Sequence, residues 1–308
     1  MNYMYRAVGA VVAAATTGSL LLAGAPAALA DSGDAAEALR AAAVIERATG
    51  TADLSSGSTA ISGAAKVSVP AESSGRIEGT TVDGGRFSLG LPETKSVRGV
   101  RSDNGTVVYA NAGEATDLAV QLTQDGSARA LVKLKNQSAP SEHRFELDLP
   151  EGVSLQSDGR GGYLAVKQDT ETVTVVGQVE APWAKDALGN PVATQYELEG
   201  ETLVQTVQVN ADTAFPVVAD PKISFGTGIY IKYSKAEVKK LYSKVTYLNA
   251  SASVCSIGGL AGIPCAAITL ATANKVKNTW EYAKDNGRCI EVKIAYNGMF
   301  SGIKHYSC

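Results

Sequence analysis

Phe215-Pro216-Val217-Val218-Ala219-Asp220-Pro221 ends an acidic part of the chain, and a basic part follows it. Residues 222–308 carry eleven Lys and one Arg against three Glu and one Asp, a net charge of +8. The whole chain carries −3, and residues 1–30 hold one positive charge, so residues 31–221 carry −12. All four cysteines lie in the basic part. Opposite charge and different covalent chemistry predict two modules, an acidic body and a basic C-terminal module.

The first thirty residues have the features of a secretory signal peptide. Residues 8–22 are mostly apolar and uncharged, and Ala28-Leu29-Ala30 has the small-x-small pattern of a cleavage site. An uncleaved anchor needs roughly 20 apolar residues, and Thr16 and Ser19 lie within this run. We therefore expect cleavage after Ala30 and a secreted, extracellular protein.

The cysteines predict disulfide bonds, because export permits them and their number is even. Four cysteines allow three pairings. We favour Cys255–Cys265, across a Gly-rich turn between two helices, and Cys289–Cys308, at the base of a hairpin. The segment has no Cys-x-x-Cys pair and only His305 nearby. We therefore expect no metal site, and no sequence pattern indicates a cofactor.

Residues 31–65 are predicted to form an Ala-rich helix and then a Ser/Thr/Gly-rich linker. Asp34 and Glu37 have the spacing of a capping box, and Gly50 is expected to end the helix. Because Ala buries little surface, we expect this helix to be attached only loosely to the rest of the protein.

Residues 66–221 have the pattern of an antiparallel β-sandwich. Short segments of alternating apolar and polar residues lie between turn signals such as Asp103-Asn104-Gly105. No stretch of helix length interrupts them. Aromatic residues are only 6% of the chain, so we expect a core made mainly of Val, Leu and Ala.

In residues 222–308 the spacing of the apolar residues changes, and the pattern predicts a small α+β module. An extended segment is followed by a capping box at Ser234 and Glu237, and apolar residues then recur at helical spacing. A second helix is expected from about Cys265 to Asp285. Asn297-Gly298 is a strong hairpin signal between the two final strands. The predicted order is strand, helix, helix and hairpin.

The basic module also holds an uncharged stretch, residues 245–274, with lysines on both sides. Two structures fit it: the buried centre of a helical hairpin, or an element at a bilayer interface. Pro264 divides it into halves too short to cross a membrane as helices. The candidate surface-binding lysines are Lys235, Lys239, Lys240, Lys244, Lys275 and Lys277.

The charge of the module allows more than one partner. Lysines can simply solvate the module, or they can bind an anionic membrane or cell-wall surface. Arg is the usual reader of bases, and Lys outnumbers it eleven to one here, so we expect no sequence-specific nucleic-acid recognition.

Catalytic patterns are weak throughout. The chain has two histidines, and we expect His143 to be exposed at the start of a strand. His305 lies on the terminal strand, with Arg288 and Glu291 on the facing strand, and these three form a candidate acid–base site. Hairpin neighbours of this kind are more often surface pairs.

Five segments carry a family resemblance. They are His143-Arg144-Phe145, Leu149-Pro150-Glu151-Gly152, Ala181-Pro182-Trp183-Ala184-Lys185-Asp186, Leu203-Val204-Gln205 and Phe215 to Pro221. They resemble a β-rich region of exported actinobacterial proteins of unassigned function, in which Val-Val-Ala-Asp-Pro is a junction before different C-terminal modules. Residues 222–308 are similar to a small Cys-containing helical-hairpin module of secreted Gram-positive proteins. The resemblance implies a layout and no catalytic residues.

Together these features predict a secreted, non-enzymatic protein of two parts. The body would be a carrier, and the basic module would act on or bind anionic cell surfaces, as an antibacterial or toxin-like effector does. Opposite charges predict contact between the modules, with proteolysis near Asp220-Pro221 as one route of release. The alternatives are a cell-envelope or adhesion protein, and a secreted hydrolase or nuclease that uses His305.

Overall fold

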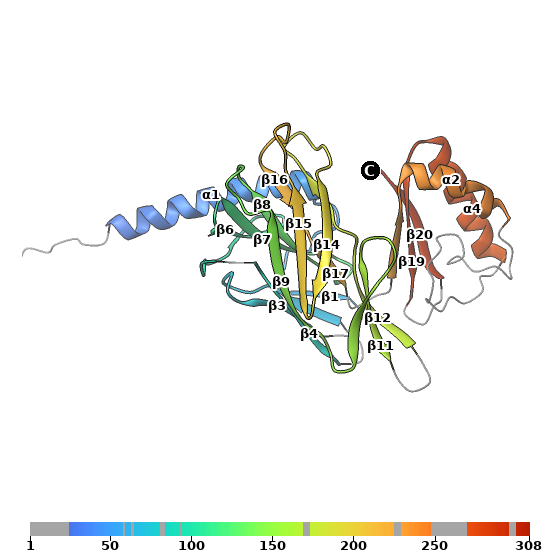
Figure 1. Cartoon of the computed structure of the whole chain (residues 1–308), viewed down its shortest axis with the longest axis horizontal. Coiled ribbons are helices and arrows are strands. Elements are labelled where there is room, and N and C mark those ends of the chain that lie inside the picture. Colours follow the sequence, from blue (N-terminus) through green and yellow to red (C-terminus); the bar gives the residue numbers. More distant parts are fainter. Residues whose placement is uncertain are drawn as a thin grey trace, which may run out of the picture.

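The computed structural model describes residues 25–57, 59–62, 65–80, 84–92, 94–168, 173–224, 229–247, 270–295 and 300–308. Within these residues the chain is mainly β. Antiparallel sheets form a body, and a small α+β module with a disulfide bond follows it (Figure 1). The predicted fold class is therefore confirmed.

Two antiparallel sheets build the body. Neighbouring strands of the first are β1 (Thr59–Ser62), β2 (Ala65–Ser68), β3 (Arg76–Thr80), β4 (Arg86–Gly90), β9 (Glu142–Asp148), β15 (Thr202–Gln208) and β14 (Ala193–Glu199). Neighbouring strands of the second are β10 (Val153–Ser157), β11 (Tyr163–Gln168), β12 (Val173–Val179), β17 (Lys222–Ser224), β8 (Ala128–Leu134), β7 (Thr116–Leu122), β6 (Val107–Gly113) and β5 (Val100–Arg101). In addition, β13 (Ala184–Lys185) pairs with β16 (Val217–Ala219), which pairs with β8. Strand β1 lies within the stretch predicted to be a linker.

Residues of both sheets form one hydrophobic core, made mainly of Val, Leu and Ala as the composition predicts. Strand β9 shows how alternation builds it, because His143, Phe145 and Leu147 are buried and their neighbours are exposed. The expectation of an exposed His143 is therefore wrong. Strand β9 starts at Glu142, which places His143 on the same inward face as Phe145, and only 4% of His143 is exposed.

Helix α1 (Ala25–Thr49) packs against the second sheet, so the expectation of a loosely attached helix is also wrong. Ala38, Ala41, Ala42 and Ile45 form one helical stripe and are buried together with residues of β6, β7, β8 and β16. Gly50 follows the helix with φ 78°, as a helix stop does.

Polar contacts also fix α1. Glu46 accepts hydrogen bonds from Ser102 Oγ at 2.6 Å and Asn104 Nδ2 at 2.7 Å. The helix begins at Ala25, so Asp34 is not its cap as predicted. The expected cleavage point after Ala30 precedes the packed stripe, which starts at Ala38, and cleavage there would leave this stripe intact.

At the Asp220-Pro221 junction, the strands on either side share one partner strand and have different second partners. We call this branch point of the second sheet the fork. Both β16 and β17 pair with β8, with Ala219 opposite Val132 and Lys222 opposite Arg129. Pro221 lies at the interruption between them, where a residue without an N–H is tolerated. On the other side, β16 pairs with β13 and β17 pairs with β12. The change of charge after Pro221 therefore comes before the chain leaves the body sheet at Ser224.

The C-terminal module has the predicted order of elements. They are β18 (Ile229–Tyr233), α2 (Lys235–Thr246), α4 (Leu270–Asp285), β19 (Cys289–Ile294) and β20 (Phe300–Tyr306), and the strands pair in the order β18, β19, β20. The predicted capping box is present, because Ser234 and Glu237 bond each other's backbone N–H groups. The turn at residues 296–299 and the predicted helix start at Cys265 lie outside the described residues.

The module has its own hydrophobic core, centred on Trp280 and Tyr233, which are fully buried. Their rings are 4.8 Å apart, and Trp280 Nε1 donates a hydrogen bond to the Val238 carbonyl at 2.9 Å. Leu164 and Val166 of β11 join this core from the body. The two modules thus have separate cores but share an apolar contact.

Candidate functional site

The candidate lysines lie on the two helices of the C-terminal module. In Figure 1, α2 and α4 form the layer of the module that faces away from the body. Lys235, Lys239, Lys240 and Lys244 are exposed on α2. By helical spacing Lys240 lies opposite the buried residues Val238 and Val245, and the other three lysines lie on the flanks of the helix. On α4, Lys275 is exposed and Lys277 is half-buried. Among the described residues, none of these six lysines forms an ion pair. The helices therefore present a cationic outer surface.

The apolar stripe of α2 is not available for binding. Val238 and Val245 are completely buried, and Leu241 and Tyr242 pack against the same core. Most of the uncharged stretch, residues 248–269, lies outside the described residues. In the part that the structure describes, no helix is long and apolar enough to span a bilayer.

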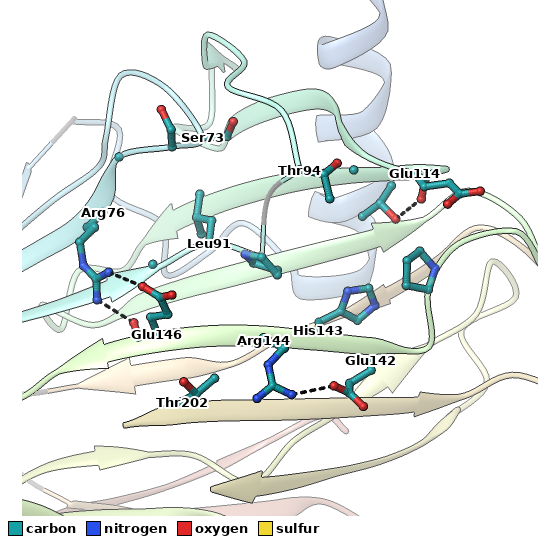
Figure 2. A pocket seen from close by; sticks show the side chains of 17 residues that line it. Ser73, Arg76, Leu91, Thr94, Glu114, Glu142, His143, Arg144, Glu146 and Thr202 are labelled. Atoms are coloured by element: carbon teal, nitrogen blue, oxygen red, sulfur yellow. Dashed lines mark hydrogen bonds and ion pairs between the residues drawn. The ribbon is translucent and has the colours of Figure 1, made fainter. Parts of the chain in front are cut away.

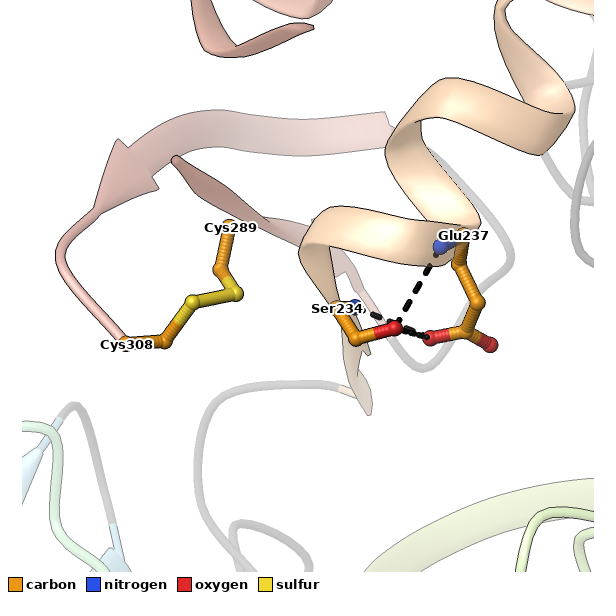
Figure 3. The surroundings of a disulfide bond; sticks show 4 residues. All are labelled: Ser234, Glu237, Cys289 and Cys308. Carbon is orange, nitrogen blue, oxygen red and sulfur yellow. Dashed lines mark hydrogen bonds between the residues drawn. A yellow bond between two sulfur atoms is a disulfide. The ribbon is translucent and has the colours of Figure 1, made fainter. Parts of the chain in front are cut away.

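The Cys289–Cys308 disulfide is present, as predicted, with the two Cα atoms 5.9 Å apart. It ties the end of the chain to the start of β19, next to the capped end of α2 at Ser234 (Figure 3). The predicted Cys255–Cys265 bond lies outside the described residues. The confirmed bond encloses the final hairpin, which carries the helical layer.

The structure does not bring the three acid–base candidates together. His305 lies opposite Ile290, whereas Glu291 lies opposite Lys304, so the His305 and Glu291 side chains project from opposite faces of the hairpin. His305 stacks on Tyr282 of α4 at 4.5 Å between ring centres. Glu291 instead forms an ion pair with Lys304 at 2.8 Å. Arg288 precedes β19, and its Nε is buried without a hydrogen-bond partner among the described residues.

A buried charge cluster joins the two modules. Glu180 follows β12 in the body, and its Oε1 lies 3.0 Å from Lys222 Nζ. Lys232 of β18 pairs with the other oxygen of Glu180. Burial opposes ionisation of Glu180, but the two ammonium groups lower its pKa to about 2. Glu180 is therefore ionised at neutral pH and is paired with Lys222 of β17 in the body sheet and with Lys232 of β18 in the C-terminal module.

Arg160 forms a second polar contact between the modules. It lies between β10 and β11, and its guanidinium donates hydrogen bonds to the Lys232 carbonyl at 2.7 Å and to Glu237 at 2.8 Å. It also lies 5.1 Å from the centre of the Tyr233 ring. The positive charges nearest the body are thus paired, and the excess positive charge of the module remains on its outer helices.

Asp220 is a buried residue of the fork, with 1% of its surface exposed. Its Oδ1 accepts a hydrogen bond from the Trp183 N–H at 3.2 Å, and its carbonyl accepts one from Tyr196 Oη at 2.8 Å. Burial raises the pKa of Asp220 to about 7. A protease cannot reach a peptide bond this deeply buried, so the folded structure does not favour release by cleavage at Asp220-Pro221.

Sequence reasoning did not find the Glu180 cluster, the Arg160 contact or the buried state of Asp220. Lys222 was counted with the solvated charges of the basic module, yet only 6% of it is exposed. Among the described residues, no group of His, Cys, Asp or Glu side chains is arranged to hold a metal ion.

Fold and surface together define a class: a β-sandwich body that holds a disulfide-bonded cationic α+β module. No protein-family model, curated protein or solved structure matches the chain.

Proposed function

We propose that the protein binds anionic cell surfaces through the helical face of its C-terminal module, and that the β-sandwich body carries and orients this module. The observation that supports the proposal best is that all four lysines of α2 are exposed. The only acidic residue of α2, Glu237, is occupied by Arg160 and by the cap of the helix.

The arrangement favours peripheral attraction over insertion. Val238 and Val245 of α2 are buried in the core of the module, and Leu241 and Tyr242 pack partly against it. Apart from the exposed Tyr247 at its C-terminal cap, the helix therefore offers mainly charge to a partner. A lysine close to an anionic bilayer contributes about 1 kcal/mol, and salt screens this attraction. The four exposed lysines of α2 therefore favour reversible binding at low ionic strength.

Binding to lipid vesicles tests the proposal. The full chain is mixed with vesicles containing about one third phosphatidylglycerol, or with purely zwitterionic vesicles, and bound protein is measured by sedimentation. We expect binding to the anionic vesicles only, and its loss at about 0.5 M salt. A parallel measurement with long-chain polyphosphate separates lipid binding from attraction to a phosphate-rich wall polymer. No binding to either polyanion at low salt would refute the proposed function.

The structure gives no support to the enzymatic alternative. His305 and Glu291 lie on opposite faces of the hairpin, and the His305 ring stacks on Tyr282 and lies away from Glu291. A role as a cell-envelope protein is compatible with the same cationic face and would show the same vesicle binding.

A further inference from the structure

A pocket opens where two strands of the first sheet separate. Strand β4 pairs with β9 only at Ser88–Asp148 and Leu89–Leu147, whereas β9 continues to pair with β15 as far as Glu142. The pocket at this split has a volume of about 500 Å³, in the range of sites for small ligands. Gly90 to Pro92 line one side and Glu142 to Arg144 the other (Figure 2).

His143 lines this pocket with an unused hydrogen-bond acceptor. Only 4% of His143 is exposed, and its imidazole hydrogen-bonds to the Pro140 carbonyl. Its Nε2 is buried and has no partner among the described residues. This places the ring proton on Nδ1 and leaves a lone pair on Nε2. Burial lowers the pKa of His143 to about 4, so the ring is neutral at pH 7. An unpaired buried acceptor is costly, and a ligand that donates a hydrogen bond would remove that cost.

The charges around the pocket exclude an anionic ligand. Arg76 Nη1 lies 3.1 Å from Glu146, and Arg144 Nη1 lies 2.9 Å from Glu142, so both guanidinium groups are already paired. Figure 2 shows these two pairs at the edge of the pocket. Together with Glu114, the lining has more carboxylates than cations. A phosphate or carboxylate would find no surplus positive charge here.

Hydroxyl groups make up much of the remaining lining. Thr94 and Thr202 contribute accessible side-chain oxygens, and Leu91 and Pro140 contribute small apolar surfaces. The hydroxyls of Ser73 and Thr116 also line the wall, but both residues are buried and donate to backbone carbonyls. Hydroxyls, carboxylates and a neutral imidazole form hydrogen bonds with ligand hydroxyls, and short apolar surfaces pack on the C–H faces of a sugar ring. We propose that this pocket binds a neutral saccharide unit, one hydroxyl of which donates a hydrogen bond to His143 Nε2. The proposal does not depend on the cationic face of the C-terminal module.

The two histidines of the chain make a direct test practical, because an imidazole ¹⁵N spectrum contains signals from only His143 and His305. The variant His305→Gln assigns the signals. The full chain is titrated with maltotriose, with the trimer of N-acetylglucosamine, with inorganic phosphate and with 1,4-diaminobutane. We expect a saturable shift of the His143 Nε2 signal with at least one trisaccharide, while the His305 signal stays unchanged.

A pair of variants on one strand separates binding from a general change of structure. Thr202 lines the pocket, and Thr206, on the same strand, does not. Thr202→Val should weaken saccharide binding about fivefold, as loss of one hydrogen bond does, and Thr206→Val should leave it unchanged. The proposal fails if neither trisaccharide moves the His143 signal, if phosphate or the diamine moves it instead, or if both threonine variants bind equally well.

Discussion

The Lys222 ammonium lies 3.0 Å from Glu180 Oε1 at the root of the C-terminal module, where less than a tenth of either residue is exposed. Removal of one partner from a buried ion pair leaves an uncompensated charge and typically costs 3–5 kcal/mol. We therefore expect Glu180→Gln to lower the free energy of unfolding by about 3 kcal/mol or more, measured by urea denaturation.

Lys304→Gln is the matched control for this change. It breaks the ion pair with Glu291, but 66% of the Lys304 side chain is exposed. Solvent screens such a pair, so the expected cost is at most about 1 kcal/mol. Equal effects of the two substitutions would show that the Glu180 cluster does not stabilise the junction.

His143 and Asp220 should change the stability of the protein in opposite directions as the pH falls. Burial lowers the pKa of His143 to about 4 from its ordinary 6.5, so the unfolded chain binds the proton more tightly. Stability from this group is complete above pH 6.5 and is lost as the pH falls towards 4. Burial raises the pKa of Asp220 to about 7 from 3.8, so the folded chain gains stability as the pH falls below 7. Between pH 7.5 and 5 each effect amounts to about 2 kcal/mol, with opposite sign.

Denaturation curves of three proteins separate these effects. The unmodified chain should show little change in stability between pH 7.5 and 5. His143→Gln should become more stable as the pH falls, because only the Asp220 effect remains. Asp220→Asn should become less stable over the same range. If the three stability profiles run parallel, neither group has the pKa that its burial implies.

Trp280 fluorescence can measure how much the disulfide bond stabilises the C-terminal module. The bond between Cys289 and Cys308 closes a loop with a sequence separation of 19, for which chain entropy alone gives about 3 kcal/mol. We expect the double substitution Cys289→Ala and Cys308→Ala to destabilise the C-terminal module by that amount. Trp280 fluorescence in a Trp183→Phe background reports on this module, because the chain has two tryptophans. Unchanged unfolding of Trp280 would assign the bond no stabilising role.

The packing of α1 leads to a prediction within one helix. Ile45 is completely buried against the second sheet, whereas Leu39 is 47% exposed. Ile45→Ala should cost about 2–5 kcal/mol, and Leu39→Ala should have little effect on stability. Removal of residues 1–30 should leave thermal stability unchanged. Equal stability of the two Ala variants would mean that the helix is not part of the folded body.

The sequence predicted the elements whose signals are local. The capping box at Ser234 and Glu237, the stop at Gly50 and the strand Ala128–Leu134 each follow from residues close together in the chain. The fork at Asp220 could not be predicted, because it depends on which strand pairs with each side of the junction.

In the candidate site, too, only the features with a local sequence signal could be predicted. Exposed lysines follow from helical spacing, since Val238 and Val245 define the buried side of α2. The pairing of Glu180 with Lys222 and Lys232 joins residues 42 to 52 positions apart, and no local pattern indicates it. The burial of His143 required the start of β9 to be known to within one residue, because a shift by one residue reverses the face of every side chain.

The most direct test of the account compares two fourfold substitutions in binding to anionic vesicles. One replaces Lys235, Lys239, Lys240 and Lys244 of α2 with Gln. The other replaces the exposed Lys66, Arg86, Lys95 and Arg98 of the body with Gln, so the change in net charge is the same. At low salt, the α2 variant should bind on the order of a hundredfold to a thousandfold more weakly than the unmodified chain, and the body variant should bind nearly as well. Equal loss of binding in both variants would mean that net charge alone governs attraction, and would contradict a binding face on the C-terminal module.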